Sequence, residues 1–131
     1  MSTNVTSDVT IVGYGPTGQV LALLLGRMGH SVTVIDRWPN LYALPRAVHA
    51  DHEVMRILQA AGVIDDVLKI TEPIDRYQWR NANDQLLLEF VFSGTGVSGW
   101  PVSNTVSQPD LEHVVDRHVN ALPNVSPRLA T

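Results

Sequence analysis

Three glycines near the start of the chain have a spacing that could hold the phosphates of a nucleotide. Gly13, Gly15 and Gly18 form the pattern G-x-G-x-x-G. In this pattern the first glycine permits a tight turn, the second lets the backbone approach a pyrophosphate, and the third lets a helix pack closely on a strand. Farther along, Asp36 offers a carboxylate that can accept hydrogen bonds from an adenosine ribose. Together these residues predict a dinucleotide-binding site.

The elements that must position these residues can be read from the apolar pattern. We expect a central parallel strand at 8–12, a helix at 16–28 that begins on Pro16, and a second strand at 32–35 that ends at Asp36. The free N–H groups and the partial positive charge at the start of the helix favour phosphate. We expect this helix to be buried on more than one side, because apolar residues surround most of it: Val20, Leu21, Leu23, Leu24, Leu25 and Met28.

Beyond Asp36 the sequence predicts a loop at 37–50 and a helix that Asp51 caps. The buried face of that helix is predicted to hold Val54, Ile57, Leu58 and Ala61. The remaining expected elements are a short helical piece at 64–70, a hairpin of strands 77–80 and 86–92, an extended loop at 93–107, and a helix from Pro109 to Pro123 that buries Leu111, Val114, Val115, His118, Val119 and Leu122.

The predicted fold class is α/β, a Rossmann-like FAD/NAD(P)-binding βαβ unit with a small added β-hairpin and an incomplete sheet. The pattern contains only two parallel strands, and the chain ends near Val125, where a third is expected. A doubly wound sheet normally has more strands than this. We therefore expect residues 1–131 to be the N-terminal part of a larger domain.

Composition narrows the classes of partner. The 131 residues carry a formal net charge of −4, which gives no electrostatic reason to expect a nucleic-acid partner. There is no cysteine, which excludes disulfides, a thiolate zinc site and a cysteine nucleophile. The first ten residues do not resemble a signal peptide, and the apolar run 20–25 is too short to span a membrane. We expect a cytoplasmic protein with no membrane partner.

The remaining polar residues leave alternatives open. Arg37 is consistent with a contact near an adenine or with a solvated loop charge, and Arg46 with a cation aimed at the cofactor or with a surface residue. Gln108 is consistent with a helix cap or a cofactor contact. The five histidines lack the spacing of a metal site, and no catalytic residue can be assigned from spacing.

Three stretches resemble a known family. These are Val9–Gly18, then Pro45–Val48 with Met55–Gly62, and finally Gly99–Pro101 with Ser107–Glu112. The chain resembles the N-terminal part of the class A FAD-dependent aromatic monooxygenases, the para-hydroxybenzoate hydroxylase group, and within it the 3-(3-hydroxyphenyl)propionate hydroxylases. The first stretch occurs in many FAD proteins, whereas the other two are more specific to these hydroxylases.

The resemblance implies FAD at the glycine pattern, with Asp36 at the adenosine ribose and Arg37 near the adenosine. It implies that Arg46 contacts the pyrophosphate or ribityl side and that Gln108 approaches the flavin chain. The implied reaction is reduction of FAD by NAD(P)H as a transient reductant, capture of O₂, and hydroxylation of a phenolic aromatic small molecule.

The chain departs from the family in lacking its mid-chain Asp-Gly motif, its later Gly-Asp motif and the substrate sheet that covers the flavin. We therefore expect such a chain either to form a homo-oligomer or to bind a complementing C-terminal chain. A second hypothesis is a dinucleotide-binding or partner-binding module without turnover. A third is an NAD-dependent dehydrogenase, although the long segment after the second strand suits a flavoprotein better.

Overall fold

A parallel sheet of three short strands lies near the N-terminus of the computed structural model, which describes residues 6–131. Its strands are β1 (Val9–Val12), β2 (Val32–Asp36) and β8 (Val125–Leu129), with β2 in the centre. The third strand begins at Val125, where the sequence indicated that one is expected, so only the prediction that the chain ends before forming it is wrong. The third strand contains Pro127, which weakens a strand pattern in sequence, but β8 lies at the edge, where a missing N–H is tolerated.

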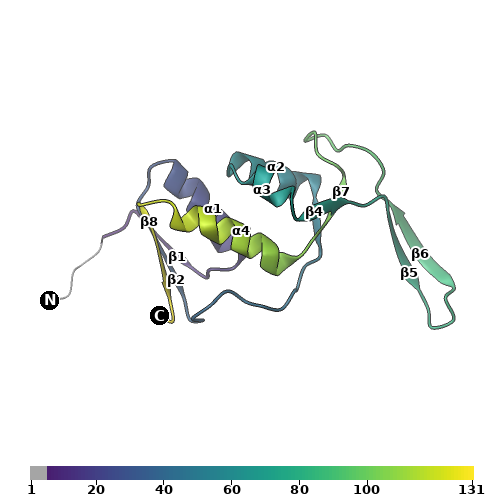
Figure 1. Ribbon diagram of the computed structural model, residues 1–131, viewed down its shortest axis with the longest axis horizontal. Coiled ribbons are helices and arrows are strands. Elements are labelled where there is room, and N and C mark those ends of the chain that lie inside the picture. Colours follow the sequence, from purple (N-terminus) through teal and green to yellow (C-terminus); the bar gives the residue numbers. More distant parts are fainter. Residues whose placement is uncertain (1–5) are drawn as a thin grey trace.

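Two helices, α1 (Pro16–Arg27) and α4 (Gln108–Asn120), pack side by side over one face of this sheet (Figure 1). Ile11 points into the resulting core and is buried, whereas Val12 points to the opposite face and is 82% exposed. The described residues leave that opposite face uncovered. Parallel sheets usually carry helices on both faces. This sheet therefore lacks the helices of one face as well as some of its strands.

Helix α1 is buried mainly on one side. Its buried positions are Gln19, Ala22, Leu23 and Gly26, while Leu21 and Met28 are 43% and 73% exposed. The prediction of burial on more than one side is thus wrong for these two residues, because α4 and the sheet cover only the inner side of the helix. Within residues 6–131, no helix has the length and apolar character needed to cross a membrane.

A second layer continues from the first. It contains β3 (His49–Asp51), α2 (His52–Ala60), α3 (Ile64–Val67), β4 (Thr71–Pro73) and β7 (Ser103–Val106). The strands form an antiparallel sheet in the order β3–β7–β4. Both β3 and β7 fall in segments predicted to be loops, and α3 is shorter than predicted. Short polar strands of this kind have no clear period, and their pairing depends on tertiary contacts.

Helix α2 begins as predicted, because the Asp51 carboxylate accepts a hydrogen bond from the backbone N–H of Val54 at 2.9 Å. Its buried face differs from the prediction. Met55, Leu58 and Ala61 are buried, whereas Val54 and Ile57 are 38% and 40% exposed. The same apolar residues allow two adjacent faces, and only packing selects one. In α4, Val114, Val115 and Val119 are buried as predicted, and Gln108 and Glu112 join them.

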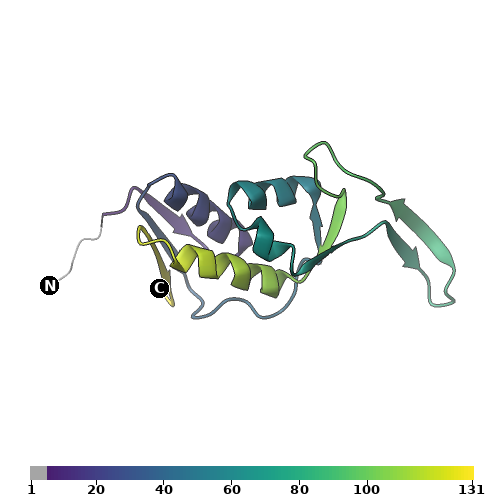
Figure 2. The same ribbon diagram turned by 45° about the horizontal axis from the view of Figure 1, so that its top comes forward.

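The predicted hairpin is confirmed as β5 (Arg76–Arg80) and β6 (Leu86–Val91), and it projects from the far end of the molecule (Figure 2). The register places Tyr77 opposite Phe90 and Trp79 opposite Leu88. These four side chains therefore share one face, and all of them are at least 40% exposed. The other face is mixed, since Gln78 and Arg76 contact Glu89 there, beside the exposed Val91 that pairs with Arg76.

Candidate functional site

The glycine loop joins β1 to α1 as a sharp turn. Gly13 has φ of +107°, and its N–H donates to the Ile35 carbonyl at 2.8 Å. A Cβ on Gly18 would collide with the Gly13 carbonyl oxygen, so this position requires glycine for close packing. By contrast, a Cβ on Gly13 or Gly15 would meet no atom within 4 Å. The first two glycines thus face open space in front of the helix, where a ligand backbone or phosphate can approach.

The start of α1 is chemically suited to an anion. Gly15 is the N-cap and has no side chain to bind the free N–H groups, and no acidic residue lies in the first turn. These N–H groups, together with the helix dipole, attract negative charge. The local geometry therefore agrees with the predicted use of the loop as a phosphate cradle.

Asp36 stands at the end of β2 beside this loop. Its Oδ2 accepts the backbone N–H of Tyr14 at 2.7 Å, and its Oδ1 accepts the backbone N–H of Trp38 at 2.9 Å. The hydrogen bonds from Trp38 and then Tyr14 lower the pKa of the Asp36 carboxyl. Each oxygen keeps a free lone pair, so Asp36 remains a charged acceptor for hydroxyl groups.

The two predicted arginines each lie over an aromatic ring. The Arg37 guanidinium is 5.1 Å from the centre of the Trp38 ring, and that of Arg46 is 4.2 Å from the Tyr42 ring. Cation–π contacts of this kind restrict the arginine without neutralising it. Both guanidinium groups are therefore available to an anion next to Asp36.

Gln108 acts on the loop that carries Arg46. Its Oε1 accepts the backbone N–H groups of Ala47 at 2.9 Å and of Arg46 at 3.3 Å. Its Nε2 donates to Oε1 of Glu112 at 2.7 Å, and Glu112 is only 1% exposed. The Gln108 amide is thus a link between α4 and the loop at 46–47.

Two cavities bring most of the predicted residues together. One of about 380 Å³ is lined by Gly13, Asp36, Arg37, Trp38 and Arg46, among others. A narrower one of about 60 Å³ adjoins Tyr14, Gly15, Asp36, Arg46 and Glu112. Gly18 lies on a third hollow along the same loop, of about 360 Å³. The predicted residues from β1, β2 and the loop after it converge here, and Gln108 reaches the group through backbone contacts.

A separate apolar cavity of about 750 Å³ lies where the hairpin meets β7. Tyr77, Phe90 and Phe92 line it from the hairpin and its end, and Val48 and His49 line it from the start of β3. The Phe90 and Phe92 rings are stacked with centroids 6.0 Å apart, and Nε2 of His49 lies 2.7 Å from Ser103 Oγ. This lining suits a flat aromatic ring with a polar substituent.

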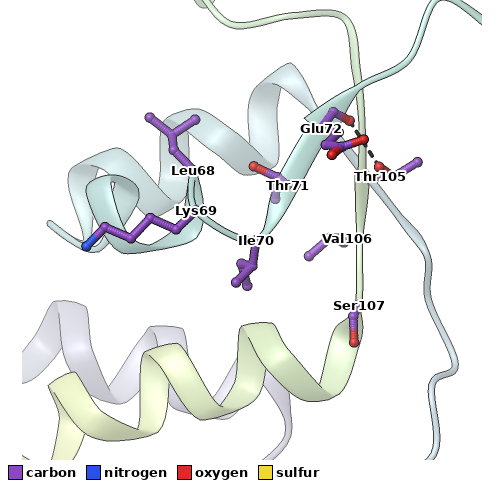
Figure 3. Close-up of a pocket in the computed structure, with 8 residues that line it drawn as sticks. All are labelled: Leu68, Lys69, Ile70, Thr71, Glu72, Thr105, Val106 and Ser107. Carbon is purple, nitrogen blue, oxygen red and sulfur yellow. Dashed lines mark hydrogen bonds between the residues drawn. The ribbon is translucent and has the colours of Figure 1, made fainter.

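Another hollow, of about 450 Å³, lies between the α3–β4 turn and the junction of β7 with α4 (Figure 3). Its cation, Lys69, is paired with Asp66 at 2.6 Å, and Thr105 Oγ1 donates to the Glu72 carbonyl at 3.1 Å. These groups are already engaged with one another. The hollow is therefore a poorer candidate than the space around the glycine loop.

Sequence reasoning missed four residues at the site: Tyr14, Trp38, Tyr42 and Glu112. Trp38 and Tyr42 hold the arginines, while Tyr14 and Glu112 line the narrower cavity. Two of them could have been found from the sequence, because Trp38 directly follows Asp36-Arg37 and Tyr14 lies between two glycines of the motif. The role of Glu112 could not be predicted. One residue in each turn of α4 can face this loop, and the sequence does not show which residue does so.

The comparison with family models gives one match that spans the described part of the chain. Residues 6–131 match the model described as "FAD binding domain". The chain belongs to this family. Its cofactor is FAD, as the sequence resemblance implied. The residues present fit the group, because the open space at Gly13 and Gly15 and the uncapped start of α1 suit its pyrophosphate.

Curated relatives of this FAD binding domain are aromatic hydroxylases. The chain is 46% identical over 121 residues to a probable NADH-specific resorcinol 4-hydroxylase of Rhodococcus jostii, covering 92% of this chain and 23% of the relative. It is 34% identical over 118 residues to a 3-(3-hydroxy-phenyl)propionate/3-hydroxycinnamic acid hydroxylase of Escherichia coli, covering 90% and 21%. The chain therefore spans less than a quarter of the length of these relatives.

The fold is also that of solved flavoprotein monooxygenases. A p-nitrophenol 4-monooxygenase from Pseudomonas putida superposes with a TM-score of 0.81 at 26% identity, over 92% of this chain and 31% of that chain. The predicted α/β fold class and the resemblance to class A FAD monooxygenases are thus confirmed. The assignment of individual residues to parts of FAD stays a prediction.

Proposed function

We propose that this chain is the FAD-holding part of a flavoprotein monooxygenase that hydroxylates a phenolic aromatic acid with NAD(P)H and O₂. The observation that carries the proposal is the convergence of the open glycine loop, the charged Asp36 and the two arginines around neighbouring hollows that share lining residues. The names of the two relatives favour a phenolic ring as substrate, and that of the Rhodococcus jostii relative favours NADH as reductant. In this proposal residues 1–131 are the N-terminal part of the FAD-binding domain of a cytoplasmic protein.

Each site residue has a proposed contact. Gly13, Gly15 and Gly18 shape the cradle for the pyrophosphate, and Asp36 accepts hydrogen bonds from the adenosine ribose. Arg37 lies near the adenosine. Arg46 contacts the pyrophosphate or ribityl side of FAD, where its positive charge offsets the negative charge of the phosphates. Gln108 fixes the backbone that carries Arg46.

The substrate side of the proposal uses the apolar cavity beside the hairpin. Tyr77, Phe90 and Phe92 offer ring faces for an aromatic molecule, and His49 offers a polar contact. When bound, FAD supplies the oxidative chemistry, while the protein binds and orients the ring and excludes water around it.

The first experiment separates cofactor binding from folding. We expect the purified chain to retain the visible absorbance of flavin after incubation with FAD and desalting. Gly15→Ala should weaken FAD binding by about tenfold or more, because its methyl group fills the space proposed for the pyrophosphate. It should leave the thermal midpoint unchanged, since that methyl group meets no protein atom within 4 Å.

A matched variant makes this experiment sharper. Gly13→Ala also adds only a methyl group, but at φ of +107° it strains the backbone, so it should lower both FAD binding and the thermal midpoint. Equal FAD affinity in wild type and Gly15→Ala would contradict the placement of the pyrophosphate.

The second candidate is a cofactor-binding or partner-binding module without turnover. The uncovered sheet face and the exposed apolar face of the hairpin favour it, because they need a second copy or a complementing C-terminal chain to cover them. Oxidation of NADH by the FAD-loaded chain, stimulated by resorcinol, supports the hydroxylase. Retained FAD without such oxidation supports the module.

A further inference from the structure

Tyr14 lies between two glycines of the phosphate-binding loop, yet it is almost fully buried, with 3% of its surface exposed. Gly13 and Gly15 have no side chains and cannot attach the loop to anything. The side chain of Tyr14 is therefore well placed to fix the position of this turn relative to the rest of the fold.

The Tyr14 hydroxyl reaches a helix far away in the sequence. It donates to Oδ1 of Asp116, on α4, at 2.8 Å. The same carboxylate oxygen accepts Nδ2 of Asn120 at 2.8 Å, and this Nδ2 also donates to the Asp116 carbonyl at 2.9 Å. Asn120 thus holds the acceptor in place, and a hydroxyl bound to a carboxylate is among the stronger hydrogen bonds in proteins.

The backbone of the same residue binds the acid of the site. The Tyr14 N–H donates to Oδ2 of Asp36 at 2.7 Å. Tyr14 also lines the narrow cavity that contains Gly15, Asp36 and Arg46. One residue therefore connects α4, the glycine loop and the carboxylate at the end of β2.

We propose that Tyr14, anchored by Asp116, is a positioning residue that holds the glycine loop and Asp36 in the geometry that receives the adenosine half of FAD. This inference rests on the proposed function. Tyr14 acts through the backbone. The hydrogen bond from its hydroxyl to Asp116 fixes the positions of the Tyr14 and Gly15 N–H groups.

The chemistry of the phenol is consistent with this role. Burial, followed by the hydrogen bond to Asp116, raises the pKa of the Tyr14 hydroxyl, so it remains a hydrogen-bond donor at neutral and mildly alkaline pH. Tyr14→Phe keeps the buried ring and removes only this donor. It is therefore the substitution that isolates the contact with Asp116.

The test is amide hydrogen exchange at Gly13 and Tyr14 in the FAD-free chain, because these two loop amides donate hydrogen bonds, to the Ile35 carbonyl and to Asp36. We expect Tyr14→Phe to speed exchange at these two amides by about tenfold, the effect of losing one hydrogen bond to a charged group. Asp116→Ala should do the same. Asp116→Asn should restore most of the protection, because its amide oxygen can still accept both the Tyr14 hydroxyl and Asn120.

The matched control is His118→Ala, which breaks another contact of α4, the 2.9 Å pair between His118 Nε2 and Asp66, away from the loop. It should leave exchange at Gly13 and Tyr14 and the FAD affinity as in wild type, whereas Tyr14→Phe should weaken FAD binding by about tenfold. Wild-type exchange at Gly13 and Tyr14 in the Tyr14→Phe variant would overturn the inference, as would equal effects of Tyr14→Phe and His118→Ala on these two amides. If the wild type retains no FAD, the proposed function fails for this chain, while the exchange measurement still decides the role of Tyr14.

Discussion

At the scale of single residues, polar side chains buried inside this fold differ in how well they are paired. Glu112 and Gln108 bind each other, and Gln108 also binds the loop at 46–47. Gln19 on α1 is fully buried, and neither its Oε1 nor its Nε2 has a hydrogen-bond partner among the described residues. A buried amide without partners destabilises the folded state, so Gln19 is a weak point of the core.

We expect Gln19→Met to raise the free energy of unfolding by about 1–2 kcal/mol, because methionine has a similar unbranched shape without the polar atoms. Urea unfolding monitored by circular dichroism measures this change. Gln19→Glu is the opposing control and should lower the stability, since it places a charge in the same site. A loss of stability in Gln19→Met would instead mean that the amide has a bound water as its partner.

At the scale of elements, hydrogen bonds and ion pairs join helices that are far apart in sequence. His118 on α4 and Lys69 after α3 both contact the Asp66 carboxylate, at 2.9 and 2.6 Å. The hydrogen bond from Lys69, and then that from His118, lowers the pKa of Asp66 from 3.8 to about 2. The contact therefore depends on an ionised Asp66.

The lowered pKa sets the direction of the pH dependence. Because the folded-state pKa of Asp66 lies below its ordinary value, the stabilisation is present above pH 3.8 and is lost as the pH falls toward about 2. We expect the free energy of unfolding of the wild type to fall more steeply over this range than that of Asp66→Asn. Parallel urea titrations of the two proteins measure the difference, and identical slopes would contradict it.

Local sequence predicted the elements with strong periods and missed those that depend on distant partners. The helix from Pro16, the cap at Asp51 and the hairpin follow from local rules and are confirmed. Strand β7 pairs with β3 and β4 from other parts of the chain. Its own residues do not alternate between apolar and polar, so local sequence does not predict it. The buried face of α2 was ambiguous for the same reason, as packing on other elements chose Met55 over Val54.

The site shows the same division. The glycines and Asp36 were predictable because their roles depend on neighbours along one βαβ unit. The contact of Tyr14 with Asp116 and that of Gln108 with Ala47 join residues that are 102 and 61 positions apart in the chain. No spacing rule relates such residues, and their meeting depends on how α4 packs against α1.

At the scale of the whole molecule, the elongated arrangement leaves apolar surface uncovered. The hairpin projects from the body and exposes Tyr77, Trp79, Leu88 and Phe90 on one face (Figure 1). The outer face of the parallel sheet exposes Val12. Surfaces of this kind favour association with a second copy or with a complementing segment.

We expect the chain to self-associate, so that its thermal midpoint rises with protein concentration. Trp79→Glu should reduce this dependence, because it places a charge on the apolar face of the hairpin. Val91→Glu is the matched control, since Val91 pairs with Arg76 on the opposite face and is similarly exposed. Sedimentation velocity measures the association, and a concentration-independent melt from a monomer would contradict the expectation.

The sequence by itself determined the βαβ unit, the phosphate-binding glycines, the acid at Asp36, the hairpin and the family, because each depends on short spacings or local backbone rules. The tertiary structure alone decided the pairing of β8 with β2, the β3–β7–β4 sheet, the buried face of α2 and the contacts of Tyr14 and Gln108. The physical reason is that these features form between segments distant in the chain, where the packing of α1, α4 and the sheets selects one of several arrangements that the local sequence allows equally.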